Sequence, residues 1–135
     1  MRRGGDPDPL KLTGRTIYEG KAEGLALVSP SPMSFYGGVN PDTGEIVEIG
    51  NELRGQSVKD RILVFPHGKG STVGSYVMYR LAKNGVAPRA IINAKCETIV
   101  AVGAIISEIP CVDMIDINRI RPGAKVSVDG ATVQF

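Results

Sequence analysis

Residues 68–75 combine glycines with hydroxyl side chains shortly after the apolar run 62–65, which makes this segment the best suited to chemistry. Glycines let the backbone approach a ligand closely, and the free amides at the start of a helix stabilise an anion. A serine hydroxyl in that field could serve as a base or a nucleophile, because its alkoxide would be stabilised. Ser71 is the candidate for that role, and Lys69 is the nearby cation that could meet a phosphate group. A glycine-rich turn that Ser71 caps without any ligand fits the sequence equally well.

The spacing of these glycines excludes two phosphate-binding motifs. A P-loop would require glycine in place of Leu63 and a serine or threonine in place of Gly70. A dinucleotide fingerprint would require glycine in place of Val73.

A second segment, residues 34–44, places two aromatic residues directly before the adjacent glycines Gly37 and Gly38. Adjacent glycines indicate a tight passage of the backbone against a partner surface or against the protein's own core. A structural bend between strands is an equally good interpretation.

The remaining reactive side chains favour structural roles. His67 follows the apolar run and could act as a base or anion contact, but a single loop histidine more often only forms hydrogen bonds. No spacing supports a Ser-His-Asp triad, and Lys69 stands where a nucleophile elbow needs glycine. Cys96 and Cys111 with one histidine cannot complete a zinc site, so we expect them to be thiols of the core or its rim. We therefore expect no metal ligands in this chain.

The pattern of apolar residues predicts the elements that must position these groups. Residues 62–65 read as a strand buried on both faces, and 72–83 as an amphipathic helix with Ser71 as its N-cap and Asn84-Gly85 as its end. Residues 99–106 are apolar all round and favour a buried helix. Further strands are expected at 16–19, 22–28, 45–49, 90–92 and 110–112, with a hairpin over 126–133.

This order predicts a mixed α/β fold in which a β-rich layer packs on a β-α-β-α-β layer. The chain has 135 residues, which suits one domain. We expect that domain to span residues 12–135, after a disordered lead-in of residues 1–11 that is rich in glycine, proline and charge.

The composition excludes several classes of partner. The formal net charge is +2, no run of Lys or Arg is present, and there is no Trp, so nucleic acid is not expected as a partner. The longest apolar run, residues 99–106, is far shorter than the roughly 20 residues that span a bilayer. Two cysteines cannot form a disulfide framework, and no signal peptide is visible, so we expect a cytoplasmic protein.

The glycine motifs together resemble the aconitase X swivel family over about residues 12–115. The resemblance is carried by short motifs that fall in the family's order: Gly14-Arg15, Gly20-Lys21-Ala22-Glu23-Gly24, residues 34–44, Gly55-Gln56-Ser57, Gly70-Ser71-Thr72-Val73-Gly74-Ser75-Tyr76, Ala87-Pro88 and Glu108-Ile109-Pro110.

The resemblance implies a swivelling β/β/α domain that works with a separate, larger catalytic subunit. That partner would hold a 4Fe–4S iron–sulfur cluster, whose iron acts as Lewis acid on a departing hydroxyl group. The implied reaction is dehydration of a phosphorylated hydroxy acid, (R)-5-phosphomevalonate, to trans-anhydromevalonate 5-phosphate, a step of a modified mevalonate pathway to isoprenoids. By the same resemblance Ser71 matches the general base, and we expect these residues to contact the substrate: Lys69, Gly70, Thr72, Ser75, Gly37 and Gly38.

Two alternatives stay open. The chain could be the small subunit of another aconitase X hydro-lyase, of the hydroxyproline dehydratase type. It could also be a swivel-type interaction module without catalytic residues.

Overall fold

The computed structural model describes residues 10–135, so residues 1–9 of the predicted lead-in 1–11 lie outside the described residues. The elements are β1 (Lys11–Thr13), β2 (Arg15–Tyr18), β3 (Lys21–Val28), β4 (Met33–Ser34), β5 (Ile62–Phe65), β6 (Gly68–Lys69), α1 (Gly74–Lys83), β7 (Ala90–Asn93), α2 (Thr98–Ser107), β8 (Cys111–Asp113), the short 3₁₀ helix η1 (Ile117–Arg119), β9 (Lys125–Asp129) and β10 (Thr132–Gln134). Lys11 was expected in the lead-in but already belongs to β1, whose Leu12 pairs with Val133 of β10.

One eight-stranded mixed sheet organises the chain, in the order β1-β10-β9-β3-β5-β7-β8-β2. Its centre, β3-β5-β7-β8, is parallel, and the flanking strands are antiparallel. The predicted mixed α/β class is confirmed, and the strands of the β-rich and β-α-β-α-β parts hydrogen-bond into this single sheet.

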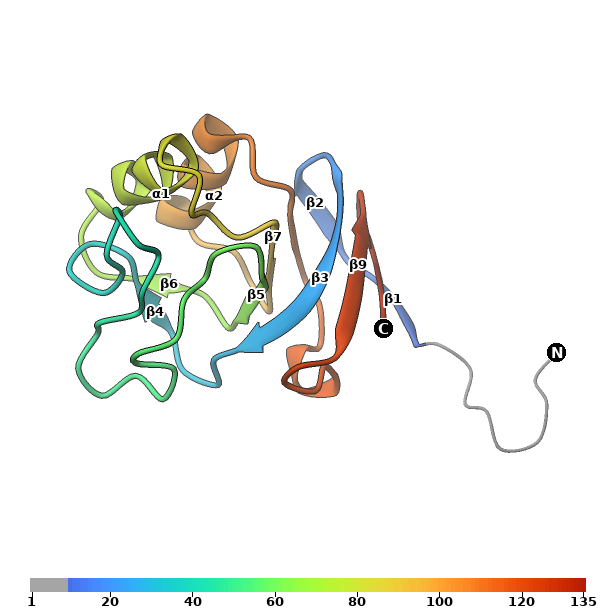
Figure 1. Ribbon diagram of the computed structural model, residues 1–135. Helices are drawn as coiled ribbons and strands as arrows, with labels where there is room; N and C mark the ends of the chain where they lie inside the picture. The colour runs from blue at the N-terminus through green and yellow to red at the C-terminus, as the bar shows by residue number, and fades with distance from the viewer. Residues whose placement is uncertain (1–9) are drawn as a thin grey trace, which may run out of the picture.

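Both helices cover the same face of the sheet (Figure 1). The chain passes from β5 through α1 to β7, and then through α2 to β8, always toward the same edge. Because parallel crossovers are right-handed, two steps in one direction place both helices on one side. The helices pack closely, and a Cβ at Gly103 of α2 would collide with the Met78 sulfur of α1.

The central strand β5 is buried on both faces, as its unbroken apolar sequence predicts. Leu63 and Phe65 face the helix-side core, and Ile62 and Val64 face the core on the other side of the sheet. Phe35 adds to the helix-side core, with its ring 5.9 Å from that of Phe65 in an edge-to-face arrangement.

One predicted strand does not form in the structure. The segment 45–49 forms no strand: Glu45 and Ile46 make only single bridges, to Ser57 and Val39. The amides of Val47 and Glu48 both donate to the Gly38 carbonyl, at 2.8 and 3.1 Å, so the ladder is interrupted there.

The apolar run 99–106 forms helix α2, as the sequence analysis favours, but this helix is not buried on all sides. Val102, Ile105 and Ile106 are 43–49% exposed on its outer face. No helix of residues 10–135 is long and apolar enough to cross a membrane.

Candidate functional site

The two glycine-containing segments that sequence analysis singled out lie side by side in the structure. The short strands β4 and β6 pair in parallel, with Met33 opposite Gly68 and Ser34 opposite Lys69. Strands of two residues leave no readable pattern in a sequence, so only the folded chain reveals this contact.

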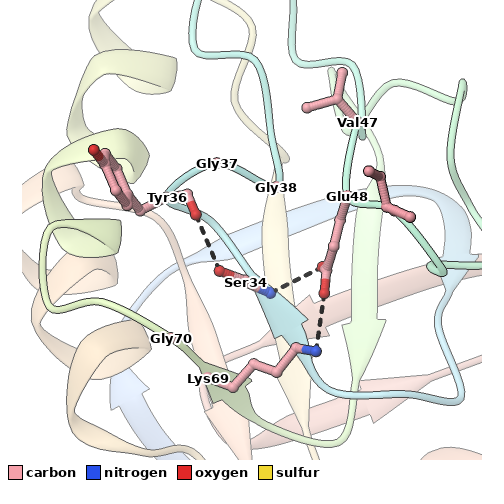
Figure 2. Close-up of a pocket in the computed structure, with 9 residues that line it drawn as sticks. Ser34, Tyr36, Gly37, Gly38, Val47, Glu48, Lys69 and Gly70 are labelled. Carbon is pink, nitrogen blue, oxygen red and sulfur yellow. Dashed lines mark hydrogen bonds and ion pairs between the residues drawn. The ribbon is translucent and has the colours of Figure 1, made fainter.

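A surface pocket of about 480 Å³ opens over this strand pair (Figure 2). Of the predicted substrate-contacting residues, Lys69, Gly70, Gly37 and Gly38 line it. Its other lining residues are Ser34, Tyr36, Val47, Glu48 and Ile49.

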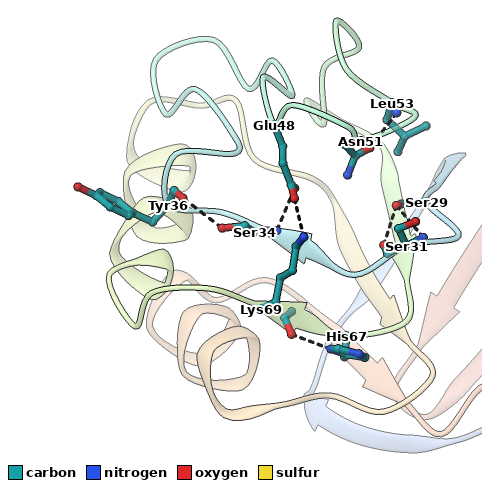
Figure 3. A network of polar contacts seen from close by, with 10 residues as sticks. Ser29, Ser31, Ser34, Tyr36, Glu48, Asn51, Leu53, His67 and Lys69 are labelled. Carbon is teal, nitrogen blue, oxygen red and sulfur yellow. Dashed lines mark hydrogen bonds and ion pairs between the residues drawn. The ribbon is translucent and has the colours of Figure 1, made fainter.

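Glu48 is the residue of this pocket that sequence reasoning missed. One of its carboxylate oxygens accepts a hydrogen bond from the Ser34 amide at 3.1 Å, and the other lies 3.0 Å from the Lys69 ammonium (Figures 2 and 3). The sequence offers no signal for this role, because the alternation in 45–49 indicates an ordinary solvated face of a strand.

Two glycines of the pocket, Gly38 and Gly70, lie in close contact with Ser34. A side chain at Gly38 would collide with the Ser34 carbonyl, and one at Gly70 would place its Cβ 2.6 Å from Ser34 Oγ. Gly37 and Gly70 have φ of +78° and +90°, a region that L side chains rarely adopt. The backbone therefore passes tightly against the protein's own chain at Gly38, whereas a side chain at Gly37 would meet no atom within 4 Å.

Ser71 follows Gly70 on an exposed turn, where its hydroxyl accepts a hydrogen bond from the Val73 amide at 3.1 Å. It is not the helix N-cap that was predicted, because residues 71–75 first form tight i→i+3 turns and α1 begins only at Gly74. Ser71 is therefore exposed just before α1, and its hydroxyl bonds the amide of Val73, the residue that precedes the helix.

Thr72 and Ser75 belong to a second hollow, of about 420 Å³, between α1 and α2. Its other lining residues are Tyr76, Thr98, Ile99, Val102 and Ile106. The buried Ser75 hydroxyl donates to the Ile99 carbonyl at 2.7 Å, which joins the two helices. The turn at Ser71 thus runs from the pocket that Lys69 and Glu48 line, at Gly70, to this largely apolar groove, at Thr72.

The remaining candidates lie outside both hollows. His67 is exposed, and its Nδ1 donates to the Gly68 carbonyl at 2.7 Å (Figure 3). Arg89 also lines neither hollow, and its guanidinium donates to the Glu23 carbonyl on β3.

The two cysteines are free thiols of the core and its rim. The hydrogen bond that the Cys111 thiol donates to Cys96, together with burial, raises the pKa of Cys111 far above its usual range. Residues 10–135 contain no group of three or more His, Cys, Asp or Glu side chains that could hold a metal ion. These residues therefore do not fit an iron–sulfur cluster.

A buried carboxylate anchors the loop after β7. Burial alone would raise the pKa of Asp113, but hydrogen bonds from the Arg15 guanidinium and the Cys96 amide, both at 2.8 Å, lower the pKa below its usual range. Cys96 directly precedes Glu97, whose carboxylate caps α2 by accepting from the Ile99 and Val100 amides. Asp113 therefore holds the helix that forms one wall of the groove.

The fold and the two glycine segments define a swivel domain of the aconitase type. The aconitase X swivel domain matches residues 11–135, and this chain belongs to that family.

Close relatives agree with this assignment. Over 120 residues, 89% of this chain and 92% of the relative, the chain is 58% identical to the phosphomevalonate dehydratase small subunit of Thermococcus sibiricus. Over 126 residues, 91% and 88% of the two chains, it is 59% identical to the protein of the same name from Methanosarcina acetivorans.

Solved structures share the fold over nearly the whole chain. A chain of the crystal structure of Thermococcus kodakaraensis aconitase X in its holo-form is 55% identical, with a TM-score of 0.91 over 93% of this chain and 97% of that one. The solution structure of a UPF0107 protein is 50% identical, with a TM-score of 0.84 over 92% and 97%.

Proposed function

We propose that this chain is the small subunit of a two-subunit phosphomevalonate dehydratase, and that Ser71 is its general base. The main support is the identity of 58% and 59% to relatives that carry this name, over about nine-tenths of the chain. The proposed reaction is dehydration of (R)-5-phosphomevalonate to trans-anhydromevalonate 5-phosphate.

The local structure around Ser71 suits a base. The Val73 amide donates to Oγ, and this hydrogen bond would become stronger as negative charge develops on the oxygen. The start of α1 adds the positive end of the helix dipole, and no acidic side chain lies in its first turn to oppose it. In the proposed step the alkoxide form of Ser71 takes the proton from the carbon next to the substrate carboxylate and becomes a neutral hydroxyl. The electron pair of that C–H bond forms the carbon–carbon double bond as the substrate's hydroxyl group leaves.

Six neighbouring residues are proposed to contact the substrate. Lys69 would face its phosphate, and Gly37, Gly38 and Gly70 would let the backbone approach it in the same pocket. Thr72 would contact the substrate from the other side of the turn. Ser75 would contact it through its hydroxyl oxygen acting as an acceptor, because the hydroxyl proton is already donated to the Ile99 carbonyl.

The iron–sulfur cluster is proposed to belong to the large subunit, where it would assist departure of the hydroxyl group.

The same large subunit is the proposed occupant of the apolar groove between α1 and α2. The outer face of α2 has no charged residue and exposes Val102, Ile105 and Ile106, beside Tyr76 of α1. An apolar face of this kind, next to the turn that carries Ser71, suits a permanent partner.

The test is a dehydration assay with (R)-5-phosphomevalonate, using this chain co-expressed anaerobically with its candidate large subunit. The Ser71→Ala complex should assemble and lose almost all turnover, since a general base contributes about 10²–10⁴-fold. Ser127→Ala, on strand β9, is the matched control and should keep wild-type turnover.

Each failure has its own meaning. Equal turnover in the wild-type and Ser71→Ala complexes would leave the interaction module as the better reading. An inactive wild-type complex that dehydrates hydroxyproline instead would favour the other hydro-lyase of the family.

A further inference from the structure

The carboxylate of Glu48 joins the three segments that build the pocket over β4 and β6. It belongs to the loop 39–57, and its two oxygens receive one donor from β4, the Ser34 amide, and one from β6, the Lys69 ammonium. Its side chain is only 15% exposed, whereas that of Lys69 is 51% exposed. A carboxylate this sheltered requires partners, and both of its oxygens have one.

The backbone, rather than the lysine, fixes where this carboxylate lies. The Gly38 carbonyl accepts from the amides of both Val47 and Glu48, and Gly38 itself is so close that its added Cβ would lie 3.3 Å from Glu48 Cβ. The Ser34 amide then holds one carboxylate oxygen at 3.1 Å. The second oxygen is therefore a fixed acceptor for whatever reaches it from β6.

Lys69 depends on this acceptor for its position. A lysine side chain has four flexible carbons, and in solvent it samples many rotamers that must be given up when it binds a ligand. The ion pair with Glu48 already holds the ammonium over the pocket (Figure 2). Since an ammonium has three N–H donors and one faces Glu48, the others remain available to an anion.

We propose that Glu48 is a positioning residue, which holds Lys69 ready for the anionic phosphate group of the substrate. The inference rests on the proposed function for its substrate class. Glu48 also carries a negative charge, which by itself would repel a phosphate. Positioning raises the affinity for phosphate and repulsion lowers it. Whether a substitution that removes the charge of Glu48 weakens or strengthens phosphate binding therefore decides between them.

The decisive variant is Glu48→Gln in the assembled two-subunit complex. Glutamine keeps the size of the side chain and can still accept from the Ser34 amide, but it cannot pair with Lys69. We expect the KM for (R)-5-phosphomevalonate and the calorimetric Kd for inorganic phosphate to rise about tenfold, with kcat changed less than about twofold.

Lys69 variants test whether Glu48 acts through that side chain. Lys69→Met should raise the KM and the phosphate Kd at least as much as Glu48→Gln does. Lys69→Arg should keep most of the wild-type affinity, because a guanidinium reaches the same carboxylate. Adding Glu48→Gln to Lys69→Met should cause no further loss. The matched control is Glu23→Gln, which removes the carboxylate of another Lys–Glu pair, with Lys125 on the exposed sheet, and should change nothing.

Several results would overturn the inference. Tighter phosphate binding by Glu48→Gln would mean that repulsion dominates. Additive losses in the double variant would mean that Glu48 acts independently of Lys69, and an unchanged phosphate Kd in Lys69→Met would remove Lys69 from the anion site.

Failure of the proposed function gives a different pattern. If the complex does not dehydrate phosphomevalonate but its phosphate Kd still depends on both residues, the reaction is wrong and the positioning role stands. Turnover of phosphomevalonate with a phosphate Kd indifferent to both residues overturns the positioning role alone.

Discussion

Gly70→Ala tests how closely the Ser71 turn is supported by the neighbouring strand. Gly70 has φ +90°, and an added Cβ would lie 2.6 Å from Ser34 Oγ. The backbone strain costs about 1.5 kcal/mol for an L residue. The contact forces Ser34 Oγ to move, which breaks its 3.1 Å hydrogen bond to the Tyr36 carbonyl and costs about 1 kcal/mol more. We therefore expect a loss of about 2.5 kcal/mol in the free energy of unfolding.

The chain supplies a control that isolates the strain. Gly55 has φ +95°, and an added Cβ there would meet no atom within 4 Å. Gly55→Ala should therefore lose only about 1.5 kcal/mol in equilibrium urea unfolding of the purified chain. The difference of about 1 kcal/mol corresponds to a melting temperature about 4 °C lower for Gly70→Ala.

Ser34→Ala separates the cost of the side-chain contact with Ser34 Oγ from the cost of the positive φ at position 70. It removes Oγ and leaves a Cβ at 3.4 Å from the new methyl group, which is an ordinary contact. In the Ser34→Ala background, the cost of Gly70→Ala should fall to that of Gly55→Ala. Equal losses at positions 70 and 55 in the wild-type background, or no recovery in the Ser34→Ala background, would refute the reasoning.

The buried carboxylate of Asp113 and the apolar groove between α1 and α2 give two further predictions. The pKa of Asp113 is lowered in the folded chain, so its ionised form stabilises the fold above about pH 4 and this stabilisation is lost as the pH falls through the folded pKa. Asp113→Asn should lower the free energy of unfolding by about 2 kcal/mol at pH 7, with the difference from wild type shrinking in urea titrations below about pH 4; a difference independent of pH would contradict this. Ile106→Asp should raise the Kd for the large subunit at least about tenfold in a calorimetric titration, while Leu25→Asp, an exposed apolar residue on β3, should not; equal effects would place the partner elsewhere.

Local patterns predicted most of the sheet and the helices, because those elements are long or strongly patterned. The apolar run at 62–65 is long enough to mark a strand buried on both faces, and Asn84-Gly85 ends α1 with Gly85 at φ +72°. Helix α2 was harder to place, since an apolar sequence has no period from which to read an exposed face. Its outer residues Val102 and Ile106 are exposed because the sheet and α1 cover only its other side.

The sequence by itself determined the family, the glycine motifs and Ser71 as the proposed base. Tertiary structure decided which residues accompany them. Ser34 and Lys69 meet through strands of two residues, and Glu48 reaches both from a loop whose alternating pattern had predicted a strand. Such contacts join residues 14–35 positions apart and depend on how loops pack over a completed sheet, which no local pattern encodes.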